Sequence, residues 1–101
     1  MPAVYATPTQ TTAPVADTTA GLWTPTSAAR ALMLYNTSGQ TIYVAFNGTT
    51  ATAAVFDIVP IANGGSAHYH AYSDLGIDVI SSVSVWFPSG ATVGNFAIRT
   101  A

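Results

Sequence analysis

The stretch RALMLYNTSGQTIYVAF, residues 30–46, decides the fold. It begins with a short apolar run, residues 31–35, followed by residues 36–40, a turn cluster with a glycine that tolerates positive φ. In residues 41–47 apolar side chains then recur at every second position, as they do in a half-buried strand. Two strand segments joined by such a turn predict an antiparallel hairpin.

Further strand-like segments follow at short spacing to the end of the chain. Turn sequences with Asn, Gly, Pro or Ser separate them, and no stretch has the 3.6-residue apolar period of a helix. The predicted strands cover residues 54–59, 66–72, 77–87 and 92–100. This spacing predicts an all-β fold, a small antiparallel β-sandwich or jelly-roll-like barrel.

The first 27 residues differ in composition from the rest of the chain. They are rich in Thr, Ala and Pro, and the recurring prolines exclude a long helix. We therefore expect residues 1–27 to form an extended arm and residues 28–101 to form the β-sandwich domain. Apolar side chains of the arm would dock into grooves of a partner, or else the arm packs across its own sheet. These side chains are Val4, Tyr5, Val15, Leu22 and Trp23.

Charge is scarce in this chain. Charged residues make up 6% of its 101 residues, Lys and Glu do not occur, and the formal net charge is −2. Two arginines cannot form a basic patch, which excludes nucleic-acid binding and attachment to an anionic membrane through a polybasic stretch. Near-zero net charge favours association, and several predicted strands are apolar on both faces. We therefore expect a protein that works inside an assembly; the alternative is a monomer kept in solution by neutral polar residues.

Other features of the sequence exclude further classes of site. Cysteine is absent, so the chain has no disulfide, thiolate or Cys-type zinc chemistry. No apolar run reaches the roughly 20 residues of a membrane span, and the N-terminus lacks the pattern of a signal peptide. Arg30 and Arg99 are each expected to pair with an aspartate, Asp57 or Asp78.

One group of residues has the spacing of a metal site. His68 and His70 lie two apart in a predicted strand and so point to the same face, and Asp74 follows in a turn. The surrounding sequence partly resembles the first cupin motif, but that motif has Glu where this chain has Asp74. The chain also has no third histidine for the second motif. We therefore expect no metal, no other cofactor and no enzymatic activity, with both histidines and Tyr72 in a polar or interfacial stripe.

Aromatic residues in the second half of the chain could form a stacking platform for a sugar. Packing in the core or at an interface is the preferred interpretation for them, because a chain with two cations offers little else to hold a ligand. The residues expected at an interface are Tyr69, Tyr72 and Trp86, together with the arm side chains above.

The β region resembles small virion proteins of tailed bacteriophages. Residues 30–46 have their opening pattern: an Arg, an apolar strand, an Asn, a small-residue turn and a second strand. Residues 61–65 and the later turn at Ser89 and Gly90 fit the same pattern. The resemblance implies a capsid decoration (cement) protein, a β-sandwich that sits on the virion surface as a homotrimer over joints between capsid subunits. Its partners would be the major capsid protein and its own copies.

Two other functions remain open at this point. The first is a receptor- or glycan-binding module of a head fibre or tail, in which Tyr69, Tyr72, His68 and His70 would line an exposed face. The second is a small cupin-like metal-binding protein that uses His68, His70 and Asp74.

Overall fold

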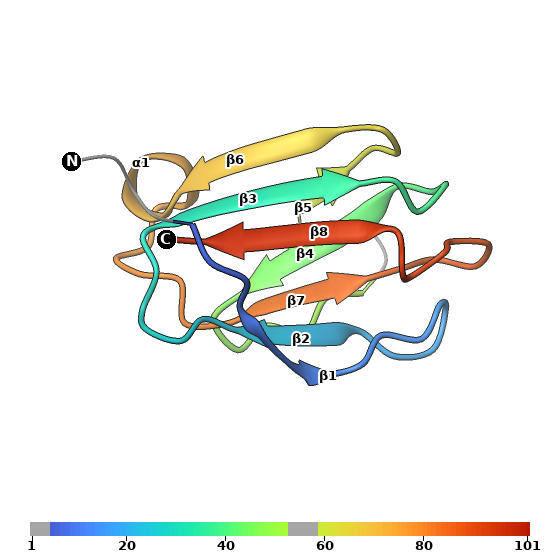
Figure 1. The fold of residues 1–101 in the computed structure, drawn as a ribbon, viewed down its shortest axis with the longest axis horizontal. Helices are drawn as coiled ribbons and strands as arrows, with labels where there is room; N and C mark the ends of the chain where they lie inside the picture. Colours follow the sequence, from blue (N-terminus) through green and yellow to red (C-terminus); the bar gives the residue numbers. More distant parts are fainter. Residues whose placement is uncertain (1–4, 53–58) are drawn as a thin grey trace.

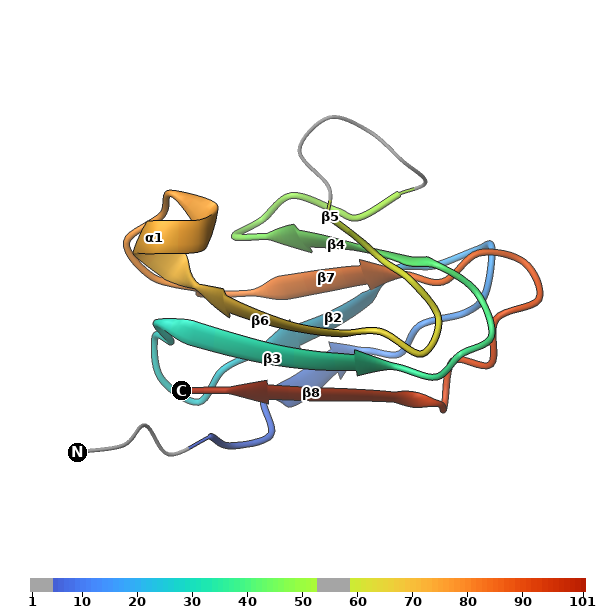
Figure 2. The ribbon, with the colours of Figure 1, turned by 90° about the horizontal axis from the view of Figure 1, so that it is seen from above.

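Two antiparallel sheets pack face to face in the computed structural model of the chain, which describes residues 5–52 and 59–101 (Figure 1 and Figure 2). The larger sheet has the strand order β1-β2-β7-β4-β5, and the smaller has the order β6-β3-β8. The strands are β1 Thr9–Thr12, β2 Gly21–Thr24, β3 Ala31–Asn36, β4 Ile42–Phe46, β5 Val59–Ile61, β6 Ser66–His70, β7 Val83–Trp86 and β8 Phe96–Thr100. This architecture confirms the all-β sandwich expected from the spacing of the turn sequences.

A short helix, α1 (Ala71–Leu75), follows β6 directly and was not expected. The sequence predicted that the strand would continue through residue 72. Instead, Asp74 accepts a hydrogen bond from the backbone N–H of His70 at 2.6 Å, which holds the first turn of the helix. Gly76 ends the helix in the left-handed conformation, with φ of 68°. A helix of five residues is too short to show an apolar period, so the pattern could not reveal it.

The bounds of three other predicted strands also differ from the structure. β8 begins at Phe96 and not at residue 92, because residues 93–95 form a turn. Only β7 forms within residues 77–87, because the earlier part of that stretch crosses between the sheets and makes a single bridge, Ile80 to Ala29. Of residues 54–59, the structure describes only the last, which begins β5; the remainder lies outside the described residues. β5 continues through Pro60, which is tolerated because β5 is an edge strand.

Part of the expected arm belongs to the sandwich itself. β1 and β2 both lie within residues 1–27, and β2 pairs with β7 in the register Trp23 to Val83. Trp23 is only 8% exposed, and a Cβ added at Gly21 would come within 2.6 Å of its ring. The indole therefore occupies the space over this glycine. Over β1 and β2 the segment is thus part of the sheet and not a free arm.

The core lies between the two sheets and follows the alternation of each strand. On β3, Leu32 and Leu34 point between the sheets and are buried, whereas Met33 and Tyr35 point outward and are exposed. The other large buried side chains of this core are Trp23, Ile42, Val44, Ile61, Ile80, Val83, Val85, Phe87 and Ile98.

A fully buried amide ties the two sheets together at one end. Asn36, the last residue of β3, donates from Nδ2 to the carbonyl oxygens of Gln40 and Ile61, both at 2.8 Å. Its Oδ1 accepts from the backbone N–H and the hydroxyl of Ser38, at 3.0 and 2.7 Å. All donors and acceptors of the amide are thereby used. The network joins β3 to the turn that follows it and to β5 of the other sheet.

Asn36→Ala should lower the free energy of unfolding by about 3 kcal/mol in chemical denaturation. The substitution leaves the carbonyls of Gln40 and Ile61 and the N–H of Ser38 without the partner they have now. Asn63→Ala is the matched control, because Asn63 accepts one hydrogen bond, from the N–H of Gly39, at an exposed position. It should cost less than about 1 kcal/mol. Equal losses for the two variants would contradict the role given to Asn36.

Candidate functional site

The outer face of the three-stranded sheet exposes large apolar side chains. Met33 and Tyr35 on the central strand β3 are 45% and 48% exposed. The strand register places His68 and Arg99 on either side of Met33. It places Ser66 and Ala97 on either side of Tyr35 in the same way. These six residues, which we call the outer face, line a shallow depression of about 460 Å³.

Charge on the outer face is limited to one arginine. Arg99 donates from Nη1 to the carbonyl of Ile98 at 2.7 Å. Among the described residues neither Arg30 nor Arg99 forms an ion pair, so the expected pairing with Asp78 is not present. The other expected partner, Asp57, lies outside the described residues.

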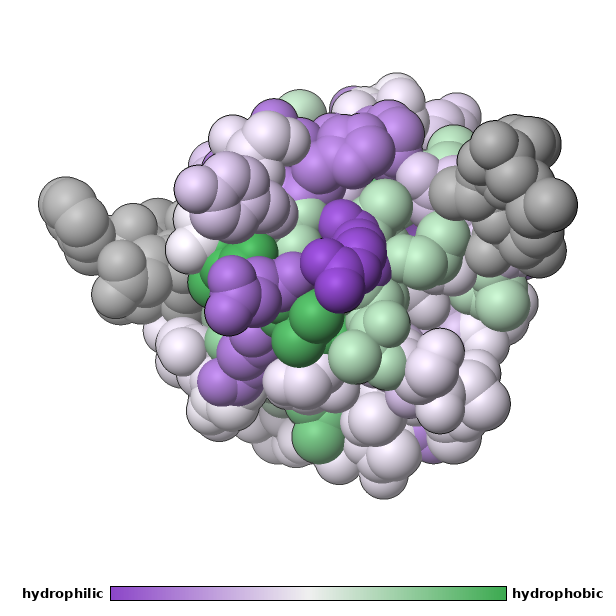
Figure 3. Space-filling view, turned by 90° about the vertical axis from the view of Figure 1, so that its left-hand side faces the viewer, coloured by the Kyte–Doolittle hydropathy of each residue, from purple (hydrophilic) through white to green (hydrophobic). Residues whose placement is uncertain are grey.

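Three of the other charged side chains lie together elsewhere, whereas Asp17 is exposed in the turn before β2. Arg30, Asp74 and Asp78 are exposed near α1 and the start of β3. Figure 3 shows the end of the sandwich that carries α1, where hydrophilic residues surround a small hydrophobic area. This end is a solvated polar surface, and it differs from the outer face in that respect.

His68 and His70 lie side by side at one margin of the outer face. Their ring centroids are 5.1 Å apart, as the period of two predicts. The Tyr5 hydroxyl is hydrogen-bonded to Nε2 of His68, and the two rings meet edge to face at 5.8 Å. The next residue, Ala6, forms an isolated antiparallel β-bridge with Thr100 of β8. The chain before β1 therefore lies along the three-stranded sheet.

Asp74 does not join the histidine pair. Its carboxylate accepts a hydrogen bond from the backbone N–H of His70. The described part of the chain contains no group of three His, Cys, Asp or Glu side chains that could hold a metal ion. The three residues considered for a cupin-like site, His68, His70 and Asp74, are thus not assembled as ligands.

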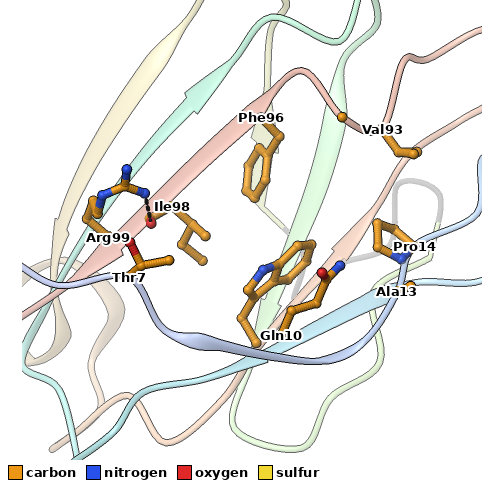
Figure 4. A pocket seen from close by; sticks show the side chains of 10 residues that line it. Thr7, Gln10, Ala13, Pro14, Val93, Phe96, Ile98 and Arg99 are labelled. Carbon is orange, nitrogen blue, oxygen red and sulfur yellow. Dashed lines mark hydrogen bonds between the residues drawn. The ribbon is translucent and has the colours of Figure 1, made fainter.

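A groove opens on the side of the sandwich between β8 and the segment that contains β1 (Figure 4). It has a volume of about 410 Å³. Two aromatic residues line it, Trp23 and Phe96, whose ring centroids lie 5.4 Å apart. The fully buried Phe87 meets Phe96 edge to face at 5.5 Å. Polar side chains of Thr7, Gln10 and Arg99 also line it. The sequence did not reveal this groove, because its walls, residues 7–14 and 93–99, are far apart in the chain.

The other residues expected at an interface are spread over the molecule. Val15 and Tyr72 are exposed, at 51% and 80%. Trp86 packs on the outside of the five-stranded sheet, against the cluster of Ala45 and Ala51. Half-buried Leu22 lies on β2, half-buried Tyr69 packs against the core, Trp23 belongs to the core, and Val4 lies outside the described residues. Met33 and Tyr35 were not among the residues expected at an interface, although the alternation of residues 31–35 places them on one face.

Tyr69 should ionise at higher pH than an ordinary tyrosine. Burial, and to a lesser degree the negative charge of Asp74, raise the pKa of Tyr69 above its usual 10.0. Because this pKa is higher in the folded than in the unfolded chain, Tyr69 makes its full contribution to the stability of the fold below a pH of about 10. The contribution is lost as the pH rises through the pKa of the folded state. Ultraviolet titration of tyrosinate should show a component at high pH that disappears in Tyr69→Phe. Identical high-pH components in both proteins would contradict the burial of this side chain.

Comparisons of the chain with protein-family models, curated proteins and solved structures found no match. In the residues that the structure describes, no helix is long and apolar enough to cross a membrane. The resemblance to phage virion proteins therefore stays a prediction made from the sequence.

Proposed function

We propose that this chain is a structural, non-enzymatic protein of an assembled particle, a capsid decoration protein of a tailed-bacteriophage virion. The observation that carries the proposal is the outer face, where Met33 and Tyr35 are about half exposed on the central strand of a sheet. Neighbouring large apolar side chains in contact with water mark a surface that binds a partner.

The outer face has the composition of a protein interface. Met33 and Tyr35 form its apolar centre, and polar or small side chains flank them on β6 and β8. An apolar centre with a polar rim is typical of surfaces that bind other proteins. Met33 and Tyr35 are already about half buried, so covering the rest of both side chains would contribute about 1.5–3 kcal/mol before the costs of association are subtracted.

The low charge of the chain supports the assembled state. With 6% charged residues and a net charge of −2, one copy has little means of repelling another copy or a capsid surface. The proposed partners are the major capsid protein and further copies of this chain in a homotrimer, and the proposed location is the virion surface. The pattern of residues 30–46 supports this choice of particle.

Met33→Lys combined with Tyr35→Lys should weaken attachment to capsid shells that lack the decoration protein by about a hundredfold or more. The apolar contacts are lost, and two ammonium groups would have to leave water at the interface. Attachment is measured by co-sedimentation with the shells and by electron microscopy of the particles. Circular dichroism checks that the double variant keeps its fold.

Tyr72→Lys is the matched control for this experiment. Tyr72 is 80% exposed but lies on α1, outside the outer face, so this variant should attach as the wild type does. The proposal is wrong if the double variant attaches equally well. It is also wrong if the wild type remains a monomer at high concentration with no affinity for any shell.

A further inference from the structure

We propose that the free edge of β8 and the groove beneath it form a binding site for an extended peptide segment of a partner protein. The segment would add to the three-stranded sheet as a strand next to β8. It would place an apolar side chain in the groove and a carboxylate against Arg99. This site shares only Arg99 with the outer face and does not depend on the proposed virion function.

The backbone of β8 has N–H and C=O groups on the side away from β3 that, before Thr100, pair with no described strand. The N–H and C=O of Thr100 both bond to Ala6, which lies on that side. Because these groups alternate along a strand, those of Ile98 and Phe96 face the same side, while those of Ala97 and Arg99 face β3. In the described chain no segment pairs with β8 on this side beyond Thr100. A row of such groups is a template for another strand.

The chain itself shows that this edge accepts an extended strand. Ala6 exchanges two hydrogen bonds with Thr100, each of 2.8 Å. The pairing then stops, because Pro8 has no N–H to donate and the chain leaves for the other sheet as β1. An added segment would continue the pairing where Ala6 leaves it.

The groove lies where the inward side chains of such a segment would point. Phe96 and Ile98 of β8 line it on one side and Pro14 on the other (Figure 4), and Trp23 also belongs to the lining. Since neighbouring side chains of a strand point to opposite faces, a residue next to an inward one would point outward, to the face that carries Arg99. Apolar and acidic residues at adjacent positions therefore match the site.

Arg99 supplies the charge that selects an acidic segment. It borders both the groove and the outer face, and it has no carboxylate partner among the described residues. Its guanidinium now binds the carbonyl of Ile98, one of the groups that face the free edge. An arriving strand would take over this carbonyl and release the guanidinium for the carboxylate.

The other edge strands of the two sheets lack this combination. All side chains of β1 are exposed, and β5 has Pro60 at its centre. On β6 the N–H of His70 is already bound by Asp74. Among the described strands, β8 alone joins unpaired backbone groups to an apolar groove and a cation. This mode of recognition is strand addition, in which backbone bonds give affinity and side-chain pockets give specificity.

The test uses the full chain, labelled for NMR, and the acetylated and amidated hexapeptide Thr-Val-Thr-Val-Asp-Thr. On binding, hydrogen exchange at the N–H groups of Phe96 and Ile98 should slow by about tenfold or more. The N–H groups of Ala97 and Arg99 already bond to β3, so their exchange should change little. Protection that is absent, or equal at all four positions, would overturn the proposal.

Two matched probes separate backbone pairing from simple apolar binding. A hexapeptide methylated at alternate backbone nitrogens keeps every side chain but cannot pair, and it should not bind. Replacing Asp by Lys in the peptide should weaken binding about threefold, and Arg99→Gln should remove that preference. Equal binding of the methylated peptide would overturn strand addition.

Shifts of the Trp23 signals by oligosaccharides but not by the hexapeptide would assign the groove to a glycan instead.

Discussion

The side-chain amide of Asn36 is the constraint on which the positions of the two sheets depend. It bonds the turn after β3 and the carbonyl of Ile61 in the other sheet. The backbone of Asn36 also pairs with Gly64 and Gly65 just before β6. A misplaced turn would leave these buried groups without partners, so the register of β3 is strongly fixed. That register decides which side chains of β3 enter the core and which form the outer face.

The two strands within residues 30–46 were predictable because their patterns are local: apolar residues on both sides of a turn that contains a glycine. The expected pairing of these strands as a hairpin is wrong, because β3 pairs with β6 and β8 whereas β4 lies in the other sheet between β7 and β5. The turn carries the chain from one sheet to the other. The helix α1 was not predictable in this way, since it depends on one carboxylate reaching back to His70 and on Gly76. β1 was not predictable for a different reason. Its sequence, TQTT, has no apolar face, and it joins the sheet only by pairing with β2, whose Trp23 is buried in the core.

In the candidate site, too, the features set by neighbouring residues were predictable, and those set by distant segments were not. The common face of His68 and His70 follows from their spacing, and the structure places the rings together. Residues 31–35 are apolar on both faces, so the sequence could not say which face would be covered by the second sheet. The groove lies between two segments about 85 residues apart along the chain, and a local sequence pattern cannot predict that such segments lie side by side.

The scarcity of charge has a consequence for the environments in which the sandwich can exist. Within the described residues the two sheets are held by apolar packing and uncharged hydrogen bonds, with no ion pair. Dissolved salt screens charges and leaves such contacts nearly untouched. The packing of the two sheets should therefore depend little on the ionic strength of the surrounding solution.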